Sequence, residues 1–190
     1  MRRRCSEPVL SVALCLVAVI LGALSIGRAE PAYAQRDKTK GKVASTPNEL
    51  LKGSAVAVEG DLLSLNGTPV RLMGIDAPDQ GQKCRNRYGH ELDCFRVATA
   101  VLASLVKDEE VSCTIAERDR LGQKKGECRV RGVDLGAAMV ARGWAFSYSS
   151  LSPAYASSEA FAQSRRLGLW AGKVEKPWQW RSRQQREQAR

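Results

Sequence analysis

The feature that most constrains the fold is an Asn-Gly pair placed between two short apolar runs. Asn66-Gly67 follows Leu63 and Leu65 and precedes the run Val70–Gly74. Asn-Gly readily adopts the positive φ angles of a two-residue hairpin turn. The pattern therefore predicts two strands joined as a hairpin, with an earlier strand around Val56–Val58.

A helix signal follows the hairpin, and two more strand signals come after it. Apolar residues recur at helical spacing in Cys94–Val106, and Asp93 can cap that helix. Residues 111–116 alternate as a strand, and residues 128–130 would return after a polar turn at 119–126.

The last part of the chain carries signals for two further helices. Asp134 can cap a helix over 135–142, and Gly143 can end it. Another helix is expected from Ser157 or Ser158 to Gly168, with a short strand at 144–148 between the two helices. Three strands, a helix, two strands and two helices favour a small α+β barrel, of which the five-stranded OB barrel is the best-known example.

The amino terminus has the pattern of a secretory signal peptide. Arg2-Arg3-Arg4 precede an apolar run from Val9 to about Ile26, and the small-x-small site Ala32-Tyr33-Ala34 follows. We therefore expect cleavage after residue 34 and export to the periplasm or the extracellular space. The alternative is a membrane-anchored protein with an uncleaved signal, because the run is at the short end of a spanning helix.

Removal of residues 1–34 would leave 156 residues, which is the length of one domain. We expect a flexible polar linker over 35–53, a folded domain over 54–181 and a polar tail over 182–190. Removal also lowers the net charge from +10 to +8. A basic chain favours polyanions such as nucleic acid, anionic polysaccharide or a lipid surface as partners. We expect a monomer with no transmembrane partner.

Four cysteines would remain in the exported chain. An even number in an exported domain indicates disulfides, and four cysteines allow three pairings. Zinc is a weaker alternative, because no two of them have the two-residue spacing of common zinc sites. In the pairing that we adopt, Cys84–Cys94 would close a loop and Cys113–Cys128 would join two neighbouring strands.

Two aspartates and an arginine stand near the ends of the predicted strands. Asp61 follows Gly60 at the first turn, Asp76 follows the third strand, and Arg71 lies within that strand. If the strands form a meander, the two carboxylates approach at one end of the barrel, where they and a backbone carbonyl would suit Ca²⁺. The guanidinium fork suits phosphate oxygens. Judged from spacing alone, however, Asp61 is more often a turn residue, Asp76 a loop cap and Arg71 a residue on the surface.

Several segments together resemble the staphylococcal-nuclease-like (thermonuclease, TNase-like) family, in particular its exported bacterial branch with paired cysteines. They cover roughly Ser54–Arg181 in the family's order. The segments are "EGDLLSLNGTPVRLMGIDAPDQGQKC", "VDLGAAMVARGWAFSY", "YASSEAFAQSRRLGLWAG" and "KPWQWR".

The resemblance implies an OB-fold barrel with packed helices and a Ca²⁺-dependent phosphodiesterase site acting on DNA and RNA. Asp61 takes the place of the metal ligand in the family's D-G-D-T motif, and Asp76 heads its D-x-P-E motif. Ala77 would offer a backbone carbonyl to the metal. Arg71 matches the strand arginine that binds the scissile phosphate, and Asp79 stands where the glutamate orients or deprotonates water.

The same motifs depart from the family at three positions. Leu62 replaces the threonine near the metal, Asp79 is one methylene shorter than the glutamate, and Gln123 replaces the arginine of a Y-G-R turn. Arginines that stabilise phosphoryl-transfer charge can contribute about 10³–10⁵ in rate. Lys125 keeps the strand parity of Gln123 but lies two residues further along, so we do not expect it to substitute.

The sequence thus leads to two main hypotheses. The first is a divergent thermonuclease-like enzyme with weak Ca²⁺-dependent hydrolysis of nucleic acid, and the alternative is a non-catalytic module that binds nucleic acid or another polyanion. A structural protein of the cell envelope is a third possibility. Tyr148 is expected near the nucleotide pocket, and the tryptophans are expected to pack helices onto the barrel. His90 is the only histidine, so a histidine-based mechanism has little support.

Overall fold

The computed structural model describes residues 49–148 and 153–190. The predicted signal peptide over 1–34 and the linker as far as residue 48 lie outside these ranges. Within them, no helix is long and apolar enough to cross a membrane.

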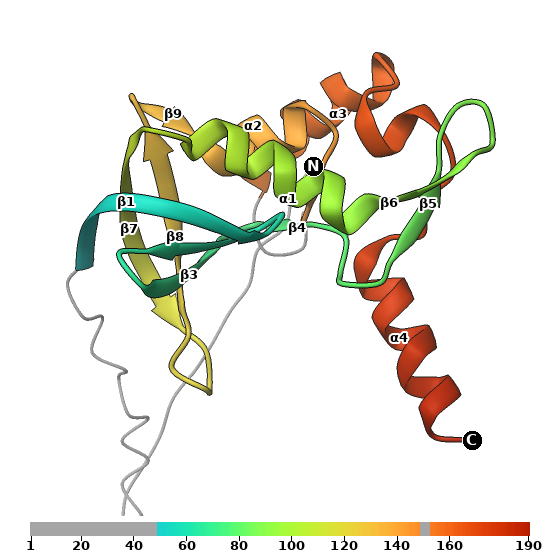
Figure 1. Ribbon diagram of the computed structural model, residues 1–190, viewed down its shortest axis with the longest axis horizontal. Helices are drawn as coiled ribbons and strands as arrows, with labels where there is room; N and C mark the ends of the chain where they lie inside the picture. The colour runs from blue at the N-terminus through green and yellow to red at the C-terminus, as the bar shows by residue number, and fades with distance from the viewer. Residues whose placement is uncertain (1–48, 149–152) are drawn as a thin grey trace, which may run out of the picture. The chain divides into compact units, whose positions relative to one another are not determined.

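Five strands close into a barrel, as predicted (Figure 1). The order is β3-β2-β1-β7-β8, and a parallel pairing between β3 and β8 closes it, whereas the other barrel pairings are antiparallel. The short β9 (Val133–Asp134) extends β8. The barrel strands are β1 (Glu49–Glu59), β2 (Leu62–Leu65), β3 (Thr68–Leu72), β7 (Glu110–Arg118) and β8 (Lys124–Val130).

The Asn-Gly turn forms the hairpin between β2 and β3. Asn66 and Gly67 have φ angles of 48° and 81°, which suit a two-residue turn. The turn sets the register so that Leu63 faces Val70, and both side chains are fully buried. The strongest local signal in the sequence is confirmed.

The first strand begins earlier than the domain boundary predicted at Ser54. Residues Glu49–Ser54 pair with β7, and Glu49 forms ion pairs with Arg118 and Lys124. The predicted linker is therefore wrong over 49–53. The side chains of residues 49–53 show no apolar period because backbone pairing and ion pairs hold this end of β1.

Helices cover the barrel at one side (Figure 1). α1 (Cys94–Val106) packs on β1, α2 (Leu135–Ala141) on β8, and α3 (Ala156–Ser164) on α2. Both predicted caps are present. The Asp93 carboxylate accepts a hydrogen bond from the Arg96 amide at 3.1 Å, and that of Asp134 accepts one from the Ala137 amide at 2.9 Å.

The buried apolar residues form two hydrophobic clusters. The barrel cluster is enclosed by the five strands, α1 and α2, and includes Leu63, Val70, Leu102 and Met139. The C-terminal cluster is smaller. It consists of Cys84, Cys94, Phe146 and Leu169, with Leu92, Trp144, Trp170, Val174 and Trp178 packed around them. Trp144, Trp170 and Trp178 thus pack in the core, as expected, and Trp144 also contacts the barrel cluster.

Short pairings build the segment between the clusters. β4 (Ile75–Asp76) pairs with β10 (Phe146–Ser147), and β5 (Lys83–Arg85) pairs with β6 (Glu91–Asp93). Short 3₁₀ turns occur at Pro153–Tyr155 and Gly168–Ala171.

The two disulfides are those predicted. Cys113–Cys128 joins the directly opposed residues of β7 and β8 inside the barrel cluster. Cys84–Cys94 ties β5 to the first residue of α1 inside the C-terminal cluster.

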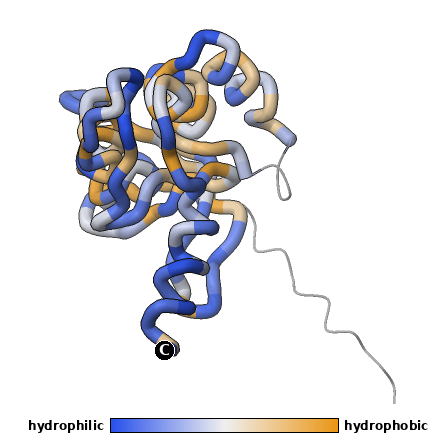
Figure 2. The backbone as a smooth tube through the Cα atoms, turned by 90° about the vertical axis from the view of Figure 1, so that its right-hand side faces the viewer, coloured by the Kyte–Doolittle hydropathy of each residue, from blue (hydrophilic) through white to orange (hydrophobic). Residues whose placement is uncertain are grey.

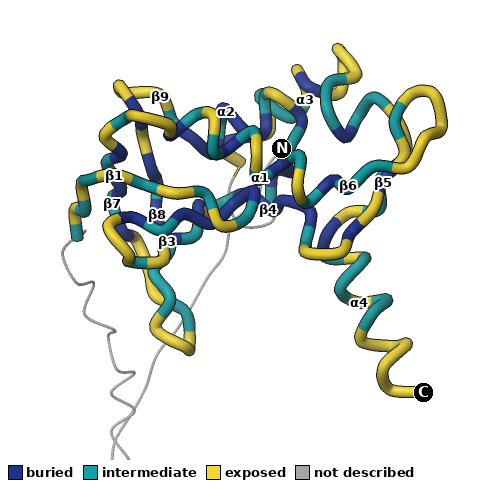
Figure 3. The backbone as a smooth tube through the Cα atoms, in the orientation of Figure 1, coloured by how far each residue is buried: buried dark blue, intermediate teal, exposed yellow. Residues whose placement is uncertain are grey.

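The predicted polar tail is helical. α4 (Pro177–Gln188) is coloured hydrophilic along most of its length in Figure 2, and its C-terminal end is exposed in Figure 3. Pro177 starts the helix and is its buried residue. Arg183 pairs with Glu175 and with Glu187 one turn away, so charge pairs along the chain support a helix that has no apolar period.

Candidate active site

The barrel side of the site consists of Arg71 and two carboxylates. Arg71 Nη1 donates to Asp61 Oδ1 at 2.5 Å, and its Nη2 donates to Glu59 Oε2 at 2.8 Å. The β2–β3 register places Arg71 opposite Leu62, next to Asp61 in the chain. The Leu72 amide also donates to the Asp61 carbonyl at 2.8 Å. The hairpin thus fixes this arginine against Glu59 at the end of β1 and Asp61 in the turn that follows.

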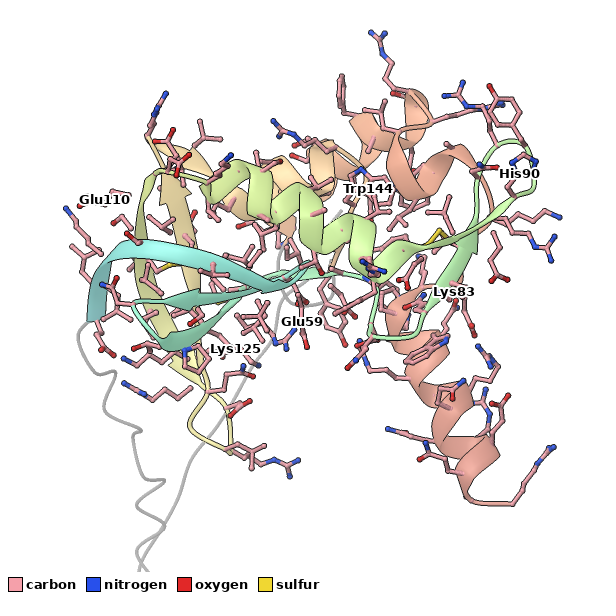
Figure 4. All side chains as sticks on the ribbon, viewed as in Figure 1. Glu59, Lys83, His90, Glu110, Lys125 and Trp144 are labelled. Atoms are coloured by element: carbon pink, nitrogen blue, oxygen red, sulfur yellow. A yellow bond between two sulfur atoms is a disulfide. The ribbon has the colours of Figure 1, made fainter. Side chains whose placement is uncertain are left out.

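Gly60 allows this turn to lie close to its neighbours. A Cβ at this position would lie 2.7 Å from the Ala77 Cβ and 2.8 Å from the Ala98 Cβ. The turn that carries Asp61 therefore rests directly on α1 and on the loop after β4. Glu59 and Glu110, labelled in Figure 4, lie well apart on the barrel, because Glu110 pairs with Ser54, five residues before Glu59 on β1, and the site lies at Glu59.

Burial dominates the electrostatics of Asp61. Its side chain is 6 % exposed, and desolvation raises the pKa of the carboxyl to about 7. Arg71 opposes this rise, whereas the charges of Asp76 and Glu59 add to it. Asp61 and Asp76 are therefore close enough to repel each other, as the meander predicted. A cation beside them would relieve that repulsion.

The second side of the site is the loop that begins with Asp76. Asp76 lies on β4, opposite Phe146 of β10, and is buried. The guanidinium of Arg181 in α4 binds both of its carboxylate oxygens, with Nη1 to Oδ1 at 3.1 Å and Nη2 to Oδ2 at 2.7 Å. Arg181 Nη1 also donates to Asp79 Oδ2 at 2.8 Å. One arginine thus spans both loop carboxylates.

Asp79 is less buried than Asp61. Its side chain is 30 % exposed, and desolvation raises its pKa although Arg181 acts to lower it. Hydrogen bonds with the acids, those of Asp76 first, raise the pKa of Arg181 despite its partial burial. The guanidinium is therefore charged at any pH at which the protein is folded.

A buried glutamine joins this loop to the C-terminal segment. Gln82 is fully buried; its Oε1 accepts a hydrogen bond from the Asp79 amide at 3.1 Å, and its Nε2 donates to the Glu175 carbonyl at 2.6 Å. The loop that carries Asp76 and Asp79 and the segment leading into α4 are thus held together.

The donor atoms fit a hard cation. Asp61 and Asp76 offer carboxylate oxygens, which are the ligands that Ca²⁺ takes. The Ala77 amide, rather than its carbonyl, contacts Asp61, at 3.4 Å from Oδ2. Among the described residues, no group of three or more His, Cys, Asp or Glu side chains is arranged to hold a metal. A cation here would rest on the two aspartates and backbone oxygen.

Gln123 lies in a turn that is held by hydrogen bonds between its own residues. Its amide donates to Asp119 Oδ1 at 3.0 Å, and its carbonyl accepts from the Asp119 amide at 3.0 Å. Lys125 lies beside Arg71 in the parallel β3–β8 pairing, but its ammonium pairs with Glu117 at 3.3 Å. Neither side chain contacts the carboxylates of the site.

Tyr148 lies against the start of α4. Its ring meets the Trp178 ring edge-on at a centroid distance of 5.8 Å, and its amide donates to the Gly74 carbonyl at 2.9 Å. It therefore lies near the Asp76 loop. His90 is exposed in the β5–β6 turn, at the far end of the C-terminal cluster from Glu59 (Figure 4).

Sequence reasoning missed Arg181, Gln82 and Glu59 as members of the site. Arg181 was included in the segment "KPWQWR", but no spacing rule connects it with a carboxylate 105 residues earlier. Glu59 occupies the first position of the motif that identified Asp61, but the sequence analysis gave it no role. Gln82 carried no signal beyond its place in a loop.

Comparison with known proteins decides the family. The staphylococcal nuclease homologue family matches residues 69–172 of the chain. The chain belongs to this family. It is 30% identical over 130 residues to the succinoglycan biosynthesis protein ExoI of Rhizobium meliloti, which covers 67% of this chain and 68% of that protein. It is 31% identical over 147 residues to the micrococcal nuclease of Shigella flexneri, over 70% of this chain and 76% of that protein.

Plant relatives are longer. The chain is 34% identical over 115 residues to the probable staphylococcal-like nuclease CAN1 of Oryza sativa, which is 59% of this chain and 32% of that protein. The chain thus spans about a third of the length of that relative. Glu59 and Asp61 precede the segment matched by the family, and Arg181 follows it.

Proposed function

We propose that this member of the staphylococcal nuclease family is a Ca²⁺-dependent phosphodiesterase that cleaves nucleic acid with low activity. The observation that carries the proposal is the pairing of Arg71 with a buried Asp61 that also feels the charge of Asp76. Relatives named as nucleases support nucleic acid as the substrate class.

The proposed roles follow from the contacts. Asp61 and Asp76 would hold the cation, with a backbone oxygen of Ala77 as a further donor. A bound Ca²⁺ supplies charge that polarises the phosphate. Arg71 has five N–H donors, of which two are used on Asp61 and Glu59, so donors remain for a phosphate oxygen. Asp79 is the group that would orient an attacking water.

Low activity is proposed because the site lacks parts that active members have. Gln123 cannot supply a charge to the phosphate, and its turn makes no contact with the carboxylates. Asp79 reaches one methylene less far than a glutamate. A misplacement of about 1 Å can cost roughly a hundredfold in rate.

A second candidate is a non-catalytic module that binds nucleic acid or another polyanion. The observation that favours it is the name of one relative, which refers to succinoglycan biosynthesis rather than to nuclease activity. The basic net charge fits either candidate.

The deciding experiment is cleavage of single-stranded DNA by the purified protein, with Ca²⁺ and with chelator. We expect slow cleavage that chelator abolishes and that Asp76→Asn removes. Glu110→Gln, which lies away from the site, is the control and should leave the rate unchanged. The double variant Asp79→Glu, Gln123→Arg should raise the rate by at least tenfold.

If only the repaired double variant cleaves, the natural protein is the binding module. If the unsubstituted protein cleaves equally well in chelator, the proposed cation dependence is wrong. DNA binding without cleavage by any variant would also favour the module.

A further inference from the structure

Arg181 is a residue of the site to which the sequence assigned no role, although it ends the segment "KPWQWR". It lies beyond the segment 69–172 that the family matches, yet it makes hydrogen bonds to Asp76 and Asp79 through both of its Nη atoms. A bidentate guanidinium–carboxylate pair is specific in geometry as well as strong. The contact is therefore part of how this chain builds its site.

The start of α4 holds Arg181 in place. Trp178 packs edge-on against Phe146 at 5.9 Å and Tyr148 at 5.8 Å, and Pro177 is buried. The Gln82 side chain binds the Glu175 carbonyl just before the helix. Arg181 thus lies on an anchored first part of the helix, with its side chain 40 % exposed.

The charges at the site are balanced between two arginines. Arg71 binds Glu59 and Asp61, while Arg181 binds Asp76 and Asp79. With all groups ionised, four carboxylates and two guanidiniums leave a formal charge of −2, which one divalent cation would neutralise. The arginines flank the carboxylates from the barrel and from α4.

We propose that Arg181 binds the substrate phosphate as the second arginine of this site, in place of the one that the turn ending at Gln123 lacks. The inference rests on the proposed function. Arg181 holds Asp76 and Asp79 in the absence of a cation and gives up Asp76 when a cation binds there. Its guanidinium then has N–H donors free for a phosphate oxygen.

This role predicts opposite effects on two binding steps. Removing the guanidinium takes a positive charge away from Asp76, so divalent cations should bind more tightly, by about tenfold. The same change removes charge-assisted hydrogen bonds to phosphate, so DNA should bind more weakly, by about tenfold. A residue that only supports the fold would weaken both steps.

The test compares Arg181→Gln with Arg183→Gln in the purified protein. Arg183 lies on the same helix and carries the same charge, but it pairs with Glu175 and Glu187. Ca²⁺ affinity is measured by calorimetry, and affinity for a phosphorothioate-linked single-stranded DNA that resists cleavage is measured in Ca²⁺. We expect tighter Ca²⁺ and weaker DNA binding for Arg181→Gln alone. Arg181→Lys keeps the positive charge but loses the bidentate guanidinium, so its affinities for Ca²⁺ and DNA should fall between those of the unsubstituted protein and Arg181→Gln.

Other results overturn the proposal. Weaker binding of both Ca²⁺ and DNA would make Arg181 structural, and tighter binding of both would make it an inhibitory counter-ion. If Arg181→Gln and Arg183→Gln weaken DNA binding equally, the loss comes from the overall positive charge of α4 and not from a specific contact of Arg181. These readouts do not need catalysis. If the expected binding pattern appears and no variant cleaves DNA, the proposed function fails while the role of Arg181 stands.

Discussion

The barrel and the C-terminal segment supply opposite halves of one site in different ways. The barrel half holds Asp61 and Arg71 on a hairpin whose register is set by its own turn and by a closed ring of strands. The C-terminal half holds Asp76 against Arg181 through side-chain packing, a buried glutamine and a helix that is otherwise exposed.

This difference shows where such a site can change. Strand pairing determines the position of Arg71 to within one register, so it cannot be moved without rebuilding the barrel. The start of α4, in contrast, is held by a few aromatic contacts, and these are enough to bring a guanidinium to Asp76 and Asp79. This is the arrangement in which we propose that Arg181 serves in place of an arginine from the barrel half.

The disulfides give the largest expected contrast between the halves. Replacing Cys113 and Cys128 with alanine should lower the free energy of unfolding by about 3 kcal/mol, because the bridge closes a 15-residue separation inside the barrel cluster. Urea denaturation of the purified protein measures this loss. All barrel strands should become easier to unfold together.

The matched variant replaces Cys84 and Cys94 with alanine. Its bridge closes a 10-residue separation in the C-terminal cluster, so hydrogen exchange should rise mainly in β5, β6 and α4. Equal loss of protection in β7 and β8 for both variants would show that the two halves unfold as one.

The buried glutamine should give an intermediate effect. Gln82→Leu keeps the size of the side chain but leaves the Asp79 amide and the Glu175 carbonyl without their partner. A fully buried polar group without a partner costs about 1–3 kcal/mol. Both groups here are only part-buried, so we expect a total loss within that range by urea denaturation. Gln163→Leu, on the exposed face of α3, is the control and should change stability by less than about 0.5 kcal/mol. A neutral Gln82→Leu would mean that the halves are not joined through this residue.

The smallest expected effect is a pH dependence in the barrel half. The Tyr155 hydroxyl lies 3.2 Å from Asp134 Oδ2, and burial, followed by the charge of Asp134, raises the pKa of Tyr155 above its usual value. Above about pH 10 the unfolded chain loses this proton while the folded protein keeps it. The contribution of Tyr155 to stability therefore falls as the pH rises above that value.

Tyr155→Phe should accordingly cost about 1 kcal/mol at about pH 8, from the lost hydrogen bond, and less at about pH 11. Unfolding in urea at both pH values measures the difference. Tyr88→Phe, at an exposed position, should change little at either pH. A Tyr155→Phe loss that grows at the higher pH would contradict the assigned direction.

Local signals account for most of what could be predicted. The Asn66-Gly67 turn, the caps Asp93 and Asp134 and the apolar spacing of α1 each depend on residues a few positions apart. The order of these elements, with the family resemblance, was enough to indicate the barrel. The error at 49–53 and the helix α4 that was not predicted both occur where polar segments are held by backbone pairing or by charge, neither of which leaves an apolar period.

The sequence by itself determined the barrel half of this protein: the hairpin that carries Arg71, the turn that carries Asp61 before it, and the pair Cys113 and Cys128 that reinforces the barrel. Only the tertiary structure decided which arginine reaches Asp76 and Asp79. That contact joins residues 105 positions apart, and its geometry depends on the packing of Trp178 and Gln82. No pattern of neighbouring residues contains such information, because long-range contacts are determined by how the folded elements pack against one another.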